Sequence, residues 1–174
     1  MLKIFTTQLN GLLKKIAEQE DEKLEDAARL LSQALVGDGH LYLYGKDEMT
    51  AVTAEALYGA EKFEQAKPLT LAAVPSLSSA DRVLLIARSA DDPELLQLIS
   101  RLFEYSIPCV LISGPASGAV PVPEEVDVHL PLPLHQGLVP TESGDRIGYP
   151  LSLAALYIYF CLSLLIHDIL AEYE

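Results

Sequence analysis

Near the start of the chain, apolar residues recur every three or four positions, which is the spacing of one face of a helix. The first such run covers residues 2–18 and the second covers residues 24–35. A mostly acidic stretch at 18–23 separates the two runs, and a Gly-Asp-Gly triplet at 37–39 ends the second. The pattern therefore predicts two helices ahead of the first strand.

Short apolar runs without helical periodicity follow, and each is closed by Gly, Pro or polar residues. The run R-V-L-L-I-A-R at 82–88 is almost continuously aliphatic, as in strands that a parallel sheet buries on both faces. Four other runs have a similar apolar character. The predicted strands are residues 41–44, 68–74, 82–88, 108–113 and 126–130.

Helical patterns alternate with these strands. One begins near Thr50, and another follows Asp92, which is suited to be an N-cap because Pro93 and Glu94 come next. The last predicted helix covers residues 151–171. Strands that alternate with helices predict an α/β fold: a three-layer α-β-α sandwich around a five-stranded parallel sheet with right-handed crossovers.

The length of 174 residues suits one domain spanning 1–174. Residues 131–150 are rich in Pro and Gly and show little periodicity, so a long loop is predicted there. Two cysteines, Cys109 and Cys161, lie in apolar segments, which favours reduced, buried thiols in a cytoplasmic protein.

The net charge of −13 repels phosphate backbones and anionic lipid surfaces. We therefore expect neither nucleic acid nor a membrane as a partner. Residues 151–166 carry no charge but are fewer than the roughly 20 residues of a spanning helix. Such an apolar helix is more often buried in a core or in a subunit interface, which predicts a homodimer through the C-terminal helix.

The first candidate ligand site is the turn at 45–50, where Gly45 ends the strand 41–44 and a helical pattern starts near Thr50. In an open parallel sheet, the loop that joins the carboxyl end of a strand to a helix is where anionic ligands commonly bind.

Two N-terminal helices, five strands in βα units and a long apolar last helix resemble the sugar isomerase (SIS) domain. The chain is most similar to small bacterial SIS-like proteins of the phosphoheptose isomerase type. The resemblance implies a Rossmann-like sheet with flavodoxin-like strand order and a sugar phosphate ligand. No cofactor is expected.

In the SIS family the first strand ends in a Gly-x-Gly-x-Ser type turn that binds phosphate. The segment Y-G-K-D-E-M-T is similar: it keeps Gly45, has Asp47 at the second glycine and offers Thr50 as the nearest hydroxyl. The resemblance assigns ligand binding to Gly45 and Thr50. Lys46 attracts a phosphate, whereas Asp47 and Glu48 repel one.

The third strand of the family ends in Ser-x-Ser-Gly, and the segment A-R-S-A matches it only at Ser89. Two interpretations remain open. Arg88 and Lys46 replace the lost hydroxyls, because a guanidinium fork suits phosphate. Alternatively, Asp91 and Asp92 themselves occupy the positive end of the following helix and leave no room for a ligand.

The glycine-rich segment at 137–152 is similar to the loop that feeds the last helix of small SIS proteins. Arg146 and Ser152 are candidate ligand residues there, and Arg146 is one of the residues that could close over a ligand from a neighbouring subunit. A surface loop without a ligand is the alternative.

Phosphoheptose isomerases use a His in the last helix and a Glu in the first βα helix as acid and base. His167 resembles that His, and Glu55 is one residue out of register with that Glu, a turn of about 100° on a helix. The alternative for His167 is a structural role at a helix end. No metal site is expected, because the four histidines show no ligand spacing.

Three functions follow as hypotheses. The first is a sugar-phosphate aldose-ketose isomerase with His167 and Glu55 as acid and base. The second is a phosphosugar-sensing module that binds without catalysis. The third is a dimeric interaction protein. Four carboxylates around one pocket, at Asp47, Glu48, Asp91 and Asp92, would instead indicate a cation or an amino sugar as ligand.

Overall fold

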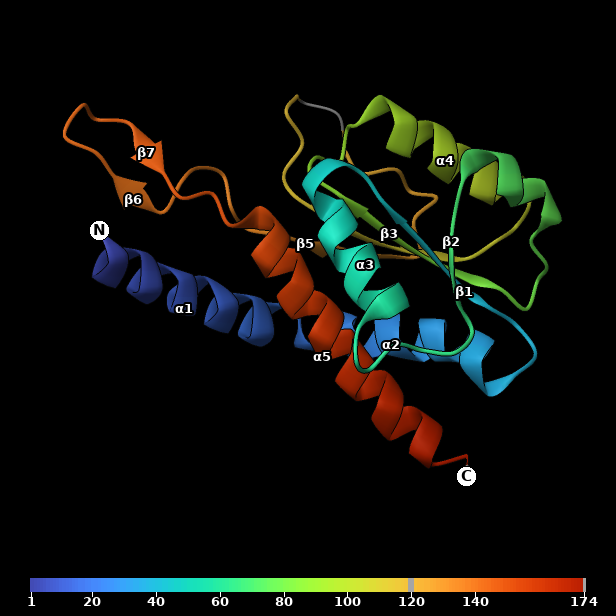
Figure 1. Cartoon of the computed structure of the whole chain (residues 1–174). Helices are drawn as coiled ribbons and strands as arrows, with labels where there is room; N and C mark the ends of the chain where they lie inside the picture. Colours follow the sequence, from blue (N-terminus) through green and yellow to red (C-terminus); the bar gives the residue numbers. More distant parts are fainter. Residues whose placement is uncertain (119–120, 174) are drawn as a thin grey trace.

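A computed structural model describes residues 1–118 and 121–173 as an α/β fold built on a five-stranded parallel sheet (Figure 1). The strand order is β2-β1-β3-β4-β5, which confirms the predicted flavodoxin-like arrangement. The strands are β1 (Leu41–Gly45), β2 (Ala66–Pro68), β3 (Arg82–Ala87), β4 (Cys109–Ser113) and β5 (Val128–Pro131).

Helices cover both faces of the sheet. One face packs against α2, α3 and α5, and the other packs against α4 and a 3-10 segment, η2. The N-terminal helix α1 extends beyond the sheet (Figure 1). The helices are α1 (Leu2–Gln19), α2 (Asp21–Val36), α3 (Thr50–Tyr58), α4 (Pro93–Glu104) and α5 (Leu151–Ala171), with 3-10 segments η1 (Asp47–Met49) and η2 (Leu71–Ser76).

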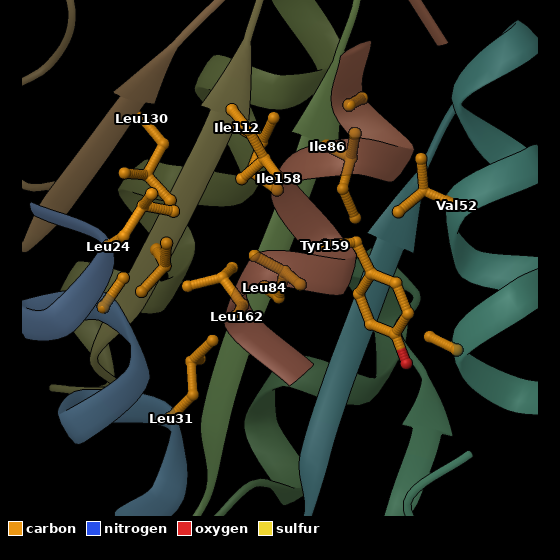
Figure 2. Close-up of a cluster of buried hydrophobic side chains, with 14 of the residues drawn as sticks. Leu24, Leu31, Val52, Leu84, Ile86, Ile112, Leu130, Ile158, Tyr159 and Leu162 are labelled. Atoms are coloured by element: carbon orange, nitrogen blue, oxygen red, sulfur yellow. The ribbon is translucent and has the colours of Figure 1, made fainter. Parts of the chain in front are cut away.

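The alternation of side chains along the strands divides the core into two clusters. Leu84 and Ile86 of β3 point to the α5 side, and Val83 and Leu85 point to the α4 side. Figure 2 shows the α5 side, where Ile158, Tyr159 and Leu162 lie over the sheet, with α2 on one side of them and α3 on the other. Burial on both faces explains the nearly continuous apolar run that predicted this strand.

The prediction of a strand at 68–74 is wrong. The second strand is Ala66–Pro68, and most of the apolar run forms η2 instead. Pro68 and Pro75 lack the N–H groups that a longer strand would need for its ladder. Leu69 and Val74 are nevertheless buried, because η2 packs on the α4 face of the sheet. The apolar character therefore indicated burial correctly but not the backbone conformation.

The start of α4 forms as predicted. The Asp92 side chain accepts hydrogen bonds from the backbone N–H groups of Glu94 and Leu95, both at 3.0 Å, and Pro93 occupies the first helical position. This is the N-cap geometry that the sequence Asp-Pro-Glu favours.

The apolar helix α5 has a mean hydropathy of 2.0, and by length and composition alone it could cross a membrane. One of its faces is buried in the core, with Leu151, Ile158 and Leu162 among the buried residues. Core packing therefore accounts for the apolar character of that face, whereas the opposite face carries exposed Leu153, Phe160 and Leu164.

The predicted loop at 131–150 contains a small antiparallel hairpin, formed by β6 (Val139–Pro140) and β7 (Arg146–Ile147). The hairpin projects from the body of the molecule above α1 (Figure 1). Gly148 at its base lies against the ring of Phe5, since a Cβ atom added there would be 3.1 Å from that ring.

Two carboxylates that precede strands accept hydrogen bonds from backbone N–H groups. Asp81, which precedes β3 and is only 4% exposed, accepts hydrogen bonds from the N–H of His40 at 2.8 Å and the N–H of Ser78 at 2.7 Å. The exposed Asp127, which precedes β5, accepts one from the N–H of Cys109 at 2.8 Å. These bonds satisfy backbone groups that the sheet ladder leaves unpaired.

Candidate functional site

Three loops meet at the carboxyl ends of β1, β3 and β4, which are adjacent strands. The chain leaves β1 to build β2 on one side and then returns to build β3 on the other, so the strand order reverses between β1 and β3. In doubly wound sheets, ligands bind in the crevice at such a switch point. The loops involved are residues 45–50, 88–92 and 114–118.

The turn after β1 is tightly wound. A Cβ atom on Gly45 would lie 2.7 Å from the carbonyl oxygen of Met49, so only glycine fits without a shift of the backbone. Asp47 adopts a left-handed φ of 53°, which is uncommon for a residue with a side chain. The Thr50 hydroxyl donates to the Asp47 carbonyl oxygen at 2.7 Å, so it is engaged by the turn itself.

Both cationic side chains predicted at the site lie there, and each is paired with carboxylates. Lys46 Nζ is 3.2 Å from Asp92 Oδ2 and 3.0 Å from Glu94 Oε2. Arg88 makes a two-pronged contact with Glu48, with Nε 2.7 Å from Oε1 and Nη2 2.5 Å from Oε2. The loop after β1 is therefore joined by ion pairs to the residues that follow β3.

These contacts shift the protonation equilibria in the expected directions. Hydrogen bonds to Glu94 and Asp92 raise the pKa of Lys46, and the Glu48 carboxylate raises the pKa of Arg88. The guanidinium in turn lowers the pKa of Glu48. Both cations are thus fully charged, but an incoming anion must compete with the carboxylates already bound to them.

Ser89 lies in a third contact group, which joins the loop after β3 to the loop after β4. Its hydroxyl is hydrogen-bonded to the Asp91 carboxylate and lies 3.0 Å from the Pro115 carbonyl oxygen. Asp91 also accepts from the backbone N–H groups of Ser117 at 3.0 Å and Gly118 at 2.9 Å. The structure therefore includes features of both open interpretations. The two cations that could bind a phosphate are present, but carboxylates pair with them and accept the hydrogen bonds of the nearby donors.

Residues 114–118, G-P-A-S-G, were missed by the sequence reasoning. A Cβ atom on Gly114 would lie 2.2 Å from the Arg88 carbonyl oxygen and 3.0 Å from Leu151 Cδ2. This glycine therefore brings three segments together. The signal that could have identified this loop was a short segment directly after a predicted strand that begins and ends with glycine and contains a serine.

Tyr149 is a second addition to the site. Its hydroxyl donates to the Leu134 carbonyl oxygen at 2.8 Å. Burial raises the pKa of Tyr149, the Glu48 charge raises it further and the Arg88 charge lowers it, which places the ring near this ion pair.

The two residues proposed from the last loop occupy different places. Ser152 lies in the first turn of α5, next to Leu151, which contacts the position of Gly114. Arg146 belongs to the hairpin, where its Nε donates to the Gly137 carbonyl oxygen at 2.7 Å and its Nη2 to that of Leu138 at 2.9 Å. Within one chain, Ser152 is close to the loops of the site and Arg146 is bound within the hairpin.

The predicted acid and base lie apart from these loops within one chain. The His167 ring is 5.2 Å from the Phe63 ring, centroid to centroid, and borders an open hollow of about 390 Å³ together with Gln65. Gln65 pairs with the N–H of Leu41 at the start of β1, so His167 is at the amino ends of the strands. Glu55 is next to Gly59. Burial is the main reason why the pKa of Tyr159 is raised to about 12, and the charge of Glu55 raises it further.

One serine-histidine pair lies beside these loops, at the carboxyl end of β4. Ser113 Oγ is 2.9 Å from His129 Nε2, and burial lowers the pKa of His129 to about 4. Ser113 is fully buried at the end of β4, so no substrate can reach its hydroxyl. Across residues 1–118 and 121–173, no three His, Cys, Asp or Glu side chains are grouped as metal ligands.

Comparison with known proteins gives the family. Residues 1–170 match the family described as a domain of unknown function, DUF2529. The chain belongs to the DUF2529 family. A curated relative of this DUF2529 protein, the "Uncharacterized protein YwjG" of Bacillus subtilis (strain 168), is 38% identical over 173 residues, and the alignment covers 99% of each chain.

Solved structures similar to the DUF2529 protein share its fold at low identity. Vibrio vulnificus NanR complexed with ManNAc-6P matches with a TM-score of 0.75 and 14% identity over 99% of this chain, which spans 64% of the NanR chain. The sugar isomerase domain of an RpiR transcription factor from Sphaerobacter thermophilus matches with a TM-score of 0.68 and 16% identity, covering 99% of this chain and 92% of that one.

An enzyme is among the similar structures as well. Phosphoheptose isomerase GmhA from Neisseria gonorrhoeae matches the DUF2529 protein with a TM-score of 0.65 and 14% identity, covering 95% of this chain and 99% of that one. The fold is therefore that of the SIS domain, as the resemblance predicted. A shared fold at this identity does not carry a function with it.

Proposed function

We propose that this DUF2529 protein binds a sugar phosphate, or a closely related phosphorylated metabolite, in the crevice between β1 and β3. The observation that carries the proposal is the position of Lys46, Arg88 and Ser89 at the switch point of an SIS fold, where two cations and a hydroxyl lie in the loops that follow the adjacent strands β1 and β3. The NanR structure, which shares this fold, contains ManNAc-6P.

The ligand groups have distinct roles in this proposal. Arg88 supplies a planar fork of donors for the phosphate, and Lys46 supplies a second positive charge. Gly45 keeps the turn close to the crevice, and the Thr50 and Ser89 hydroxyls donate to phosphate oxygens. Ser152 contributes from the first turn of α5.

Binding without catalysis is the function that the geometry of one chain supports better. An isomerase needs an acid and a base within hydrogen-bond reach of the sugar carbons. Because Glu55 and His167 both lie apart from the crevice within one chain, they would meet that requirement only if a neighbouring subunit supplied them. Arg146 with its hairpin would also reach a ligand from a neighbouring subunit. Turnover of a sugar phosphate that is lost in His167→Ala would establish the isomerase instead.

The binding proposal is tested with Arg88→Ala and a panel of sugar phosphates that includes ManNAc-6P. We expect at least about a tenfold loss of affinity, because a charge-assisted bond to phosphate contributes about 1.5 to 3 kcal/mol. Isothermal titration calorimetry measures the change. Arg101→Ala is the matched control, because Arg101 pairs with Glu104 at the far end of α4.

Two outcomes would contradict binding at this crevice. One is a wild-type protein that binds no member of the panel. The other is an Arg88→Ala variant that binds as tightly as Arg101→Ala does.

We also propose that the protein is a homodimer that pairs through the outer face of α5. Leu164 is 63% exposed there, and Leu153 and Phe160 lie on the same side of the helix. A second copy suits this surface because α5 carries no charged residue between Leu151 and Ile166. The free thiols of Cys109 and Cys161 agree with a cytoplasmic setting, which remains part of the proposal.

Leu164→Glu is expected to dissociate the dimer, raising its dissociation constant by about a hundredfold, because two carboxylates would be buried in an apolar contact. Sedimentation velocity at micromolar concentration gives the measurement. Phe103→Glu is the matched control, because Phe103 is also 63% exposed but lies on α4, across the sheet. A wild-type monomer, or equal dissociation in both variants, would refute the α5 interface.

A further inference from the structure

The Asp91 carboxylate accepts hydrogen bonds from a group of donors of the kind that binds an anion. The N–H groups of Ser117 and Gly118 point to its two oxygens at 3.0 Å and 2.9 Å. Successive backbone N–H groups of this kind form an anion-binding concavity. The Ser89 hydroxyl also donates to the Asp91 carboxylate. One carboxylate therefore accepts hydrogen bonds from the loops after β3 and β4, next to the switch point between β1 and β3.

Asp91 joins the loop after β3 to the loop after β4, and it has no part in the cap of α4. The neighbouring Asp92, and not Asp91, caps α4. The Asp91 side chain is also only half-buried, so it does not fill the core. Its donors, with the Ser89 hydroxyl first, lower the pKa of Asp91 to about 2, so the carboxylate is charged at neutral pH. The loops of the crevice thus hold a permanent internal anion.

We propose that Asp91 is a built-in anion that holds the phosphate position of the crevice and that a ligand must displace it. The inference rests on the proposed function, because Ser89 is one of the proposed ligand groups. Asp91 is then a specificity-determining residue. It lowers the affinity of the protein for every anion. The reduction is largest for anions that have no more charge and no more acceptor oxygens than a carboxylate.

Chemistry decides which ligands succeed in this competition. A phosphate monoester presents three acceptor oxygens and a charge of about −1.5 to −2 at neutral pH, so it can take the N–H groups of the loop after β4 and engage Arg88 as well. A sugar acid presents one carboxylate, which would replace the Asp91 carboxylate without gaining further hydrogen bonds or charge. The class of ligand is therefore phosphorylated sugars, with sugar acids excluded.

The test measures the affinity of inorganic phosphate for the wild-type protein, Asp91→Ala and Asp91→Asn by calorimetry. Removing a like charge within hydrogen-bond range of the phosphate should tighten binding by about tenfold or more in Asp91→Ala. Asp91→Asn, which keeps one acceptor oxygen but no charge, should fall between. Asp26→Ala is the control, because it removes one carboxylate from the exposed side of α2.

The same variants are titrated with ManNAc-6P and with a sugar acid, and circular dichroism confirms that each variant is folded. Phosphate affinity that is unchanged or weaker in both Asp91 variants overturns the inference, including the case in which no variant binds phosphate. If the wild-type protein still binds ManNAc-6P through Arg88, the proposed function survives that failure. A gain of phosphate binding in Asp91→Ala, with no sugar phosphate bound by any variant, supports the internal anion and rejects the proposed function.

Discussion

Asp81→Ala is expected to lower the free energy of unfolding by about 3 kcal/mol or more. The buried carboxylate accepts hydrogen bonds from the N–H groups of His40 and Ser78 and from the Ser78 hydroxyl. Each buried donor left without an acceptor costs about 1 to 3 kcal/mol. Urea denaturation followed by far-UV circular dichroism gives the value, since the chain contains no Trp.

Asp127→Ala is the matched control for this prediction. Asp127 stands at the corresponding place before β5, but it is exposed and accepts a single backbone hydrogen bond, from Cys109. Water can replace that acceptor, so the loss should be about 1 kcal/mol or less. Equal losses for the two variants would show that the burial of Asp81 does not decide its contribution.

The Asp81 contribution should also depend on pH. Burial raises the pKa of Asp81, but the hydrogen bonds from Ser78 and His40 lower it by more, so the pKa of the folded state lies below 3.8. A carboxyl group of this kind stabilises the fold fully above the pKa of the unfolded chain, and the contribution is lost as the pH falls through the folded value. The difference in stability between wild type and Asp81→Asn should be constant above about pH 5 and should shrink in more acidic solution.

Gly114→Ala is expected to cost about 3 kcal/mol and to weaken ligand binding at the same time. The added Cβ would lie 2.2 Å from the carbonyl oxygen of Arg88, which is backbone and cannot rotate away. The loop after β4 must then separate from the loop after β3, which displaces the guanidinium of Arg88. Urea denaturation and sugar phosphate titration measure the two effects.

The control for Gly114 is another glycine. Gly11 lies within α1, and an added Cβ would meet nothing within 4 Å. Gly11→Ala should therefore raise stability by about 0.5 to 1 kcal/mol, because alanine loses less backbone entropy in a helix. A Gly114→Ala variant that matches the wild type in both measurements would rule out the close approach of the two loops.

Several elements could be predicted from the sequence because local physics decides them. The run at 82–88 forms β3, which is buried on both faces, and Asp92 with Pro93 starts α4 as its residue types favour. The five-stranded parallel sheet agrees with the alternation of strands and helices, and its strand order agrees with the order that the SIS resemblance implied. The second strand was misplaced because an apolar run looks the same in a buried strand and in a buried 3-10 turn.

The candidate site could be predicted only in part. The sequence placed Lys46, Arg88 and Ser89 at the carboxyl ends of neighbouring strands, and in the structure they lie in the loops that follow the adjacent strands β1 and β3. Their partners could not be predicted, because the Arg88–Glu48 contact joins residues 40 positions apart and the Ser117–Asp91 contact joins residues 26 apart. Such contacts depend on the directions that side chains take after the sheet has formed.

The amino-acid sequence by itself determined most of the layers of this protein: the positions of the helices α1 to α5, the buried strands β3 and β4, and that α5 is apolar on nearly all sides. These features follow from the residue types within each segment, since burial and capping act over a few neighbouring positions. Only the tertiary structure decided that Asp91 binds the loop after β4 while Asp92 caps α4. Two adjacent aspartates have the same local chemistry, and only the positions of the surrounding N–H groups distinguish them.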